Sequence, residues 1–87
     1  MTRETKPISP AQRALGIAIR AARLKACYSQ EDFARHAGID RSYYGAVERG
    51  TFNLRFSTLL RIAAGLGIGS GEIVSSAEAI ERELRET

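Results

Sequence analysis

The sequence predicts an all-α fold, with five short helices in one compact domain and a short helical extension at the C-terminus. Apolar residues recur at spacings of three and four, as on the buried face of a helix. No segment alternates apolar and polar residues over the length of a strand. Capping residues and glycines divide the chain into about five segments. A length of 87 residues fits a single domain.

The first helix is predicted to begin after Ser9, which can cap it. Pro10 fits the first turn, and Gln12 can complete a capping box. The helical pattern fades over residues 25–28. Its expected buried stripe consists of Leu15, Ile19 and Ala22, widened by Ile17 and Leu24.

The second and third helices are each bounded by a capping residue and a glycine. Ser29 is the expected N-cap of the second helix, and Gly38 ends it. Asp40 caps the third helix, which runs to Arg49 and ends at Gly50. The expected inward residues are Phe33, Ala34, Ala37, Tyr44 and Val47. Because Gly45 costs a helix about 1 kcal/mol relative to alanine, something should favour a missing side chain there.

A loop over residues 51–56 precedes a fourth helix from about Phe56 to Leu66. This helix is poorly capped if Arg55 is its N-cap, although Ser57 offers an alternative. Its expected buried residues are Leu59, Ile62, Ala63 and Leu66. The glycine-rich run 65–71 has no P-loop lysine and follows a helix, so it is interpreted as a helix end and a turn.

The last helical region is expected from Ser70 to about Arg85, with a break near Ser75 and Ser76. Ser75 and Glu78 would form a second capping box there. We therefore divide the chain into an N-terminal arm (1–8), a helical domain (9–75) and a C-terminal extension (76–87).

Charge is distributed unevenly along the chain. Residues 1–70 contain eleven basic and five acidic residues, a net charge of +6, whereas residues 71–87 contain two basic and five acidic residues, a net charge of −3. Eleven of the thirteen basic residues are arginine, whose planar fork suits phosphates and guanine edges. This asymmetry favours a polyanionic partner for the body of the domain.

Several classes of function are disfavoured by composition. One cysteine, Cys27, and one histidine, His36, are too few for a disulfide framework, a zinc site or an acid–base pair. We therefore expect no enzyme activity, metal, cofactor or small-molecule ligand. No apolar window is long enough to span a bilayer, and the first ten residues do not form a secretory signal. A cytoplasmic protein without a membrane partner is expected, in a bacterial or phage nucleoid.

Residues 29–49 have the organisation of a helix-turn-helix unit, in which two short helices flank a glycine-containing turn. The second helix of such a unit, here 40–49, enters a DNA major groove about 12 Å wide. Once the inward residues are removed, its outward set is Arg41, Ser42, Tyr43, Ala46 and Arg49.

Motifs in the same order resemble the phage-repressor and Cro-type family of transcriptional regulators. The main ones are Ser29-Gln30-Glu31-Asp32-Phe33-Ala34, Gly38-Ile39, Val47-Glu48-Arg49-Gly50 and Leu59-Leu60-Arg61-Ile62-Ala63. The resemblance covers about residues 13–74 and favours small stand-alone regulators, including controller proteins of restriction-modification systems. It implies a five-helix domain that binds operator DNA as a homodimer, without a cofactor.

The resemblance also implies roles for individual residues. Arg41, Ser42 and Ala46 match base-reading positions. Gln30, Tyr43 and Asn53 match backbone contacts, to which we add Arg49. Arg23 and Glu48 match an internal ion pair. Two departures are Phe52, where relatives often have a basic residue, and Arg55, where they have a small polar cap.

Two questions stay open from the sequence. Ile73, Ala77, Ile80 and Leu84 follow the rhythm of a helix that packs on a partner helix. Ile80 and Leu84 are expected at a twofold dimer interface, and the alternative is that they fold back on the first helix. The alternative function is a protein-interaction module, such as an antitoxin or bridging subunit, that keeps the fold without reading DNA.

Overall fold

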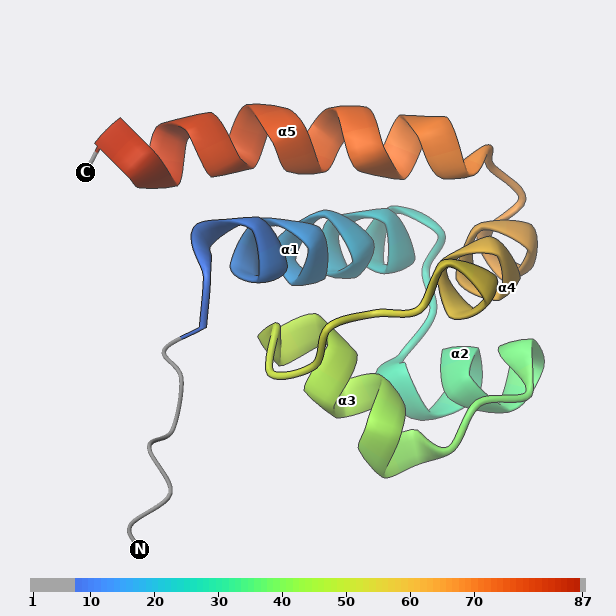
Figure 1. The fold of residues 1–87 in the computed structure, drawn as a ribbon. Helices are drawn as coiled ribbons and strands as arrows, with labels where there is room; N and C mark the ends of the chain where they lie inside the picture. The colour runs from blue at the N-terminus through green and yellow to red at the C-terminus, as the bar shows by residue number, and fades with distance from the viewer. Residues whose placement is uncertain (1–7, 87) are drawn as a thin grey trace, which may run out of the picture.

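The computed structural model describes residues 8–86, and most of the expected N-terminal arm lies outside this range. The described chain contains five helices and no strand (Figure 1). They are α1 (Pro10–Lys25), α2 (Gln30–Ala37), α3 (Arg41–Arg49), α4 (Phe56–Leu66) and α5 (Ser70–Glu86). The prediction of an all-α five-helix fold is confirmed.

Helix α1 occupies the centre of the molecule. On one side α5 runs along it in the opposite direction, and this is the most extensive helix pair (Figure 1). On the other side α3 packs against α1, while α2 contacts α3 and α4. The acidic C-terminal helix and the helix-turn-helix unit therefore lie on opposite sides of α1.

The helix ends follow local chemistry that the sequence predicts. Ser9 and Gln12 form the expected capping box of α1. Ser29 and Asp40 each accept a backbone N–H in the first turn of the next helix. Helices α2, α3 and α4 all end at a left-handed glycine. No side-chain hydrogen bond caps the start of α4 at Arg55, as expected.

Cys27 is the exception among the helix ends. It follows α1 with φ of +66°. A residue other than glycine adopts this backbone conformation only at a steric cost. Its side chain is exposed. His36 is exposed, and its ring stacks on that of Tyr28.

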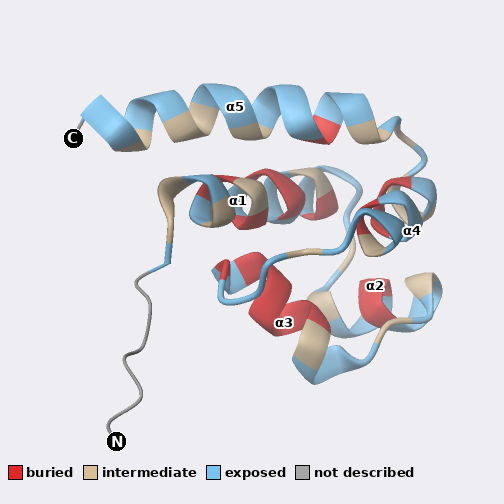
Figure 2. Cartoon of the chain, viewed as in Figure 1, coloured by how far each residue is buried: buried red, intermediate tan, exposed pale blue. Residues whose placement is uncertain are grey.

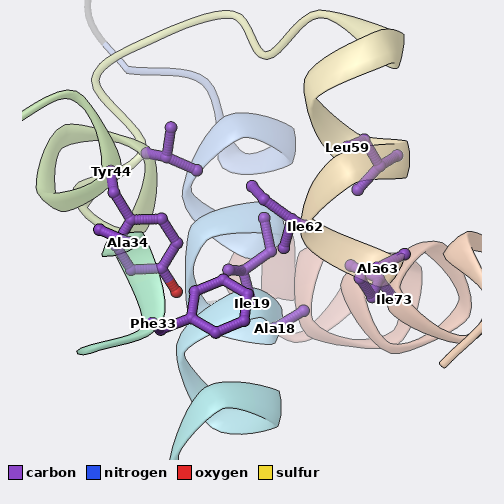
Figure 3. Packing of buried hydrophobic residues seen from close by; sticks show 10 residues of the cluster. Ala18, Ile19, Phe33, Ala34, Tyr44, Leu59, Ile62, Ala63 and Ile73 are labelled. Carbon is purple, nitrogen blue, oxygen red and sulfur yellow. The ribbon is translucent and has the colours of Figure 1, made fainter. Parts of the chain in front are cut away.

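The core lies between α1, α2, α3 and α4, and one residue of α5 completes it (Figure 3). Tyr44 and Phe33 are its largest fully buried side chains, with ring centroids 5.2 Å apart. Ile19, Ile62 and Ile73 are also fully buried. Figure 2 shows that the buried residues of α1, α3 and α4 lie where these helices face one another, while α5 is mostly exposed.

Two expectations about α1 and α5 are wrong. Ile17 and Leu24 do not widen the buried stripe, because they are 39% and 53% exposed. Helix α5 does not break near Ser75, because Ala77 and Ile80 continue the stripe begun by Ile73 and pack against the core. This packing keeps residues 70–86 in one helix, so no capping box forms at Ser75.

The C-terminal extension is therefore the second half of α5. Ile80 packs against the core of its own chain, as the alternative reading of the sequence expected. Ile80 and Leu84 are both half-buried in the single chain.

Candidate nucleic-acid interface

The turn between α2 and α3 is held by backbone hydrogen bonds. Gly38 has φ of +70°, and the N–H of Ile39 donates to the carbonyl of Ala34. Asp40 then caps α3 through the N–H of Tyr43. These bonds fix α3 relative to α2, as a helix-turn-helix unit requires.

Two glycines bring α3 directly against α1. A Cβ added at Gly16 would lie 2.4 Å from the carbonyl oxygen of Glu48, and one at Gly50 would lie 2.9 Å from the Cα of Arg13. Real Cβ atoms essentially never lie this close to another atom. The backbones of the two helices therefore approach at both places only because the side chains are missing.

A buried hydrogen-bonded network connects α3 to α1 and α2, and we call it the Glu48 network. Arg23 on α1 donates two hydrogen bonds to the Glu48 carboxylate, from Nε at 2.6 Å and from Nη2 at 3.1 Å. Gln30 Nε2 donates to Glu48 Oε1, the oxygen that Arg23 Nη2 also binds, at 2.8 Å, and the Tyr44 hydroxyl donates to Oε2 at 2.5 Å. Arg23 Nη1 also donates to the carbonyl of Tyr28. The contact expected between Arg23 and Glu48 is present.

The network sets the protonation states of its members. Burial alone would raise the pKa of Glu48, but hydrogen bonds from Arg23, Tyr44 and Gln30 together outweigh it and hold the pKa below its ordinary value. Burial and the bond to Glu48 raise the pKa of the Tyr44 hydroxyl. The hydrogen bond to Glu48 raises the pKa of Arg23 against the opposing effect of burial. The ion pair is thus fully charged at neutral pH.

The sequence predicted the ion pair by resemblance but missed Tyr44 and the second role of Gln30. Tyr44 precedes Glu48 by four residues, so the two share a helix face, and this spacing is a usable signal. Gln30 was expected only at DNA. In the structure its amide nitrogen is bound to Glu48, and its Oε1 lies toward Gly45 on α3.

Beyond the network, α3 has an exposed polar surface, which we call its outer face. Arg41, Ser42 and Arg49 are exposed, and Tyr43 is half-buried. Among residues 8–86, neither Arg41 nor Arg49 has an ion pair or a hydrogen bond. Asn53 is exposed in the loop that follows α3.

The expectation that Ala46 faces outward is wrong, because it is only 6% exposed. The chain reverses at Gly50 and folds back on this side of α3. Thr51 donates to the carbonyl of Ala46, and the ring of Phe52 lies 5.3 Å from that of Tyr43. Ala46 is thus buried beside the segment that follows α3.

The helix-turn-helix family model matches residues 19–73, which include the turn, α3 and the Glu48 network. The chain belongs to this family. The helix-turn-helix family expected from the sequence motifs is therefore confirmed. No helix within residues 8–86 is long and apolar enough to cross a membrane. The same residues contain no cluster of three side chains that could hold a metal ion.

Two curated relatives are similar to this helix-turn-helix chain. One is a hypothetical transcription factor of Neisseria meningitidis, 38% identical over 56 residues, which are 64% of this chain and 53% of that protein. The other is the control protein C.MunI of a Mycoplasma species, 44% identical over 50 residues, which are 58% of this chain and 68% of that protein. The chain thus spans about half of the Neisseria relative.

Two solved structures have the same fold. The restriction-modification controller protein C.AhdI of Aeromonas hydrophila is 37% identical, with a TM-score of 0.69 over 71% of this chain and 94% of that chain. The controller protein C.Esp1396I, solved as a tetramer with its natural 35-base-pair operator, is 25% identical. Its TM-score is 0.74, over 82% of this chain and 93% of that chain.

Proposed function

We propose that this chain is a sequence-specific regulator of transcription that binds double-stranded operator DNA as a homodimer. The observation that supports this most directly is the outer face of α3. It presents two arginines that have no partner among the described residues, on a helix fixed by the Glu48 network. Regulation follows from occupying the operator, without catalysis, in the cytoplasm.

Within this proposal Arg41 reads a base edge and Ser42 assists it. An arginine fork at the start of a recognition helix matches the O6 and N7 acceptors of guanine. Tyr43, Arg49 and Asn53 hold the DNA backbone, and Gln30 lies at the edge of the same surface. Because Gln30 Nε2 already donates to Glu48, only its second amide hydrogen remains for a phosphate.

The relatives support this assignment. C.Esp1396I binds its operator as a tetramer in the solved complex, and C.AhdI and C.MunI are controller proteins. A controller of restriction-modification genes is accordingly the regulator type that we propose for this chain.

A groove between α1 and α5 supports the dimer. It has a volume of about 630 Å³ and is mainly apolar, with Ala21, Ala22, Leu66, Ile68, Ala79 and Ile80 among its lining residues. Pairing of two chains through α5, including Ile80 and Leu84, would bury this groove. It would also keep the acidic helix away from DNA, since α5 and α3 lie on opposite sides of α1 (Figure 1). Twofold symmetry then predicts an inverted repeat with half-sites about 34 Å apart.

Selection of bound duplexes from a random pool tests DNA reading. We expect an inverted repeat to be enriched and to bind about 10³-fold or more tightly than random duplex at physiological salt. A protein that binds all duplexes equally, or none, contradicts the proposal and favours the interaction module.

Sedimentation at micromolar concentration tests the dimer. Because Ile80 packs in its own core, the variant is Ala79→Glu with Leu84→Asp. The control is Arg85→Glu, an exposed position of α5 that does not line the groove and that changes the net charge by the same amount. We expect a dimer for wild type and control, and a monomer with retained helical circular dichroism for the variant. A folded variant that stays dimeric places the interface elsewhere.

A further inference from the structure

Gly45 lies in the middle of α3, four residues after Arg41 and four before Arg49, so all three share one side of the helix. A Cβ added at Gly45 would meet only the far ends of side chains. These are Arg41 Nη1 at 3.0 Å, Arg49 Nη1 at 3.3 Å and Gln30 Oε1 at 3.8 Å. No core or backbone atom is among these nearest neighbours. The missing side chain is therefore not explained by packing inside the fold, in contrast to Gly16.

The two guanidinium groups converge over the bare backbone of Gly45. Because their Nη1 atoms lie 3.0 Å and 3.3 Å from one point, they are at most about 6.3 Å apart, the sum of these two distances. No acidic side chain pairs with either group within residues 8–86, since Glu48 is bound in its own network. Two like charges held this close, without a counter-charge, form a site for electron-rich acceptors.

The spacing of this arginine pair fits neighbouring acceptors of DNA. Successive base pairs are stacked about 3.4 Å apart, and each guanine presents O6 and N7 in the major groove. Two forks within about 6 Å of each other can therefore bind acceptors on adjacent base pairs. A side chain at position 45 would separate the forks, because either contact with it would be tighter than an ordinary van der Waals contact.

We propose that Gly45 determines the specificity of the recognition helix. Its missing side chain lets the guanidinium groups of Arg41 and Arg49 converge and read adjacent base pairs of one half-site. This inference rests on the proposed function and extends it, because Arg49 becomes a reader of bases in addition to a backbone contact. Gly45 itself is a positioning residue that acts through the two arginines.

The test is Gly45→Ala, which separates reading from stability. Alanine is the better helix former, and its methyl group displaces only flexible side-chain ends, so Tm should rise by about 4–8 °C. Affinity for the selected operator should fall about tenfold or more, while affinity for random duplex stays unchanged. Selection repeated with the variant should lose base preference at two adjacent positions of each half-site.

The matched control is Gly71→Ala, at an exposed helical glycine of α5 with no atom within 4 Å of the added Cβ. It should leave operator affinity unchanged. If Gly45→Ala binds and selects the operator as wild type does, the inference is overturned and the proposed function stands. If Gly45→Ala lowers Tm, the glycine is structural and the inference is overturned. A wild type without any preferred site overturns both.

Discussion

The two faces of α3 place their charged groups in opposite situations. On the inner face, Glu48 accepts four hydrogen bonds from three side chains, and no buried polar side-chain atom among the described residues lacks a partner. On the outer face, Arg41 and Arg49 are exposed and have no charged partner in the described chain. The difference supports the proposal that the inner face stabilises the fold and that the outer face binds DNA. Substitutions on the two faces should therefore separate folding from DNA binding.

The largest effect is expected on the inner face. Glu48→Ala leaves the Arg23 guanidinium buried without its counter-charge and removes the acceptor for Tyr44 and Gln30. The free energy of unfolding should fall by about 3–5 kcal/mol, measured by urea denaturation. A variant whose unfolding curve overlays that of wild type would show that the network contributes nothing.

Gly16→Ala tests the close approach of α1 and α3. The added methyl group would lie 2.4 Å from the carbonyl oxygen of Glu48, so the helices must separate. We expect a loss of about 1–3 kcal/mol in unfolding free energy. Gly71→Ala is the control, because its methyl group meets open space and should stabilise the chain by up to about 1 kcal/mol. Equal stability of the two variants would refute the contact.

Arg41→Ala tests the outer face. Operator binding should weaken by about 1–3 kcal/mol with loss of preference at one base pair, while the unfolding free energy stays within about 0.5 kcal/mol of wild type. Fluorescence anisotropy with operator and random duplexes measures both affinities. Equal weakening on the two duplexes would make Arg41 a phosphate ligand, and lost stability would make it structural.

Lowering the pH should reduce the contribution of Glu48, on the inner face, to the free energy of unfolding. The folded pKa of Glu48 is below the unfolded one, about 4.3, so its contribution to stability is complete above that pH. The contribution is lost as the pH falls through the folded pKa. Unfolding free energies measured from pH 7 to pH 3 should therefore decline more steeply for wild type than for Glu48→Gln. Parallel declines would contradict the pKa assignment.

The smallest effect on the free energy of unfolding is expected for Cys27→Gly. Cys27 lies outside both faces of α3. Glycine adopts the observed φ of +66° without steric cost, so the free energy of unfolding should rise by up to about 1 kcal/mol. Thermal unfolding measures this gain, with Cys27→Ala as a control that retains the strain. An unchanged Tm in the glycine variant would show that the backbone there is relaxed.

The sequence predicted what depends on near neighbours. Helix boundaries at Ser9, Ser29 and Asp40 follow from contacts within three residues, so they agree with the structure. The errors at Ala46 and Ser75 have a different origin. Ala46 is buried beside the segment that follows Gly50, and the unbroken helix α5 packs along α1. Both errors concern positions that pack against another segment of the chain. The local sequence pattern does not predict how such segments pack together.

In the candidate site, too, the sequence predicted the features that depend on local spacing but not those that depend on how helices pack. Arg41, Ser42 and Arg49 are exposed as predicted, because helical spacing alone separates them from Tyr44 and Val47. The convergence of the arginines over Gly45 and the attachment of Gln30 to Glu48 require the relative placement of α2 and α3. The cost of a mid-helix glycine was the only local signal, and it pointed to Gly45 without giving the reason.

The close contacts at Gly16 and Gly50 have a consequence for the DNA itself. A recognition helix attached to its neighbour by backbone at two places has little freedom to tilt toward an imperfect site. The duplex must then change shape to fit the helix. The energy of bending or twisting it depends on the sequence of base steps. In the proposed inverted repeat, we therefore expect the central base pairs to influence affinity through their flexibility.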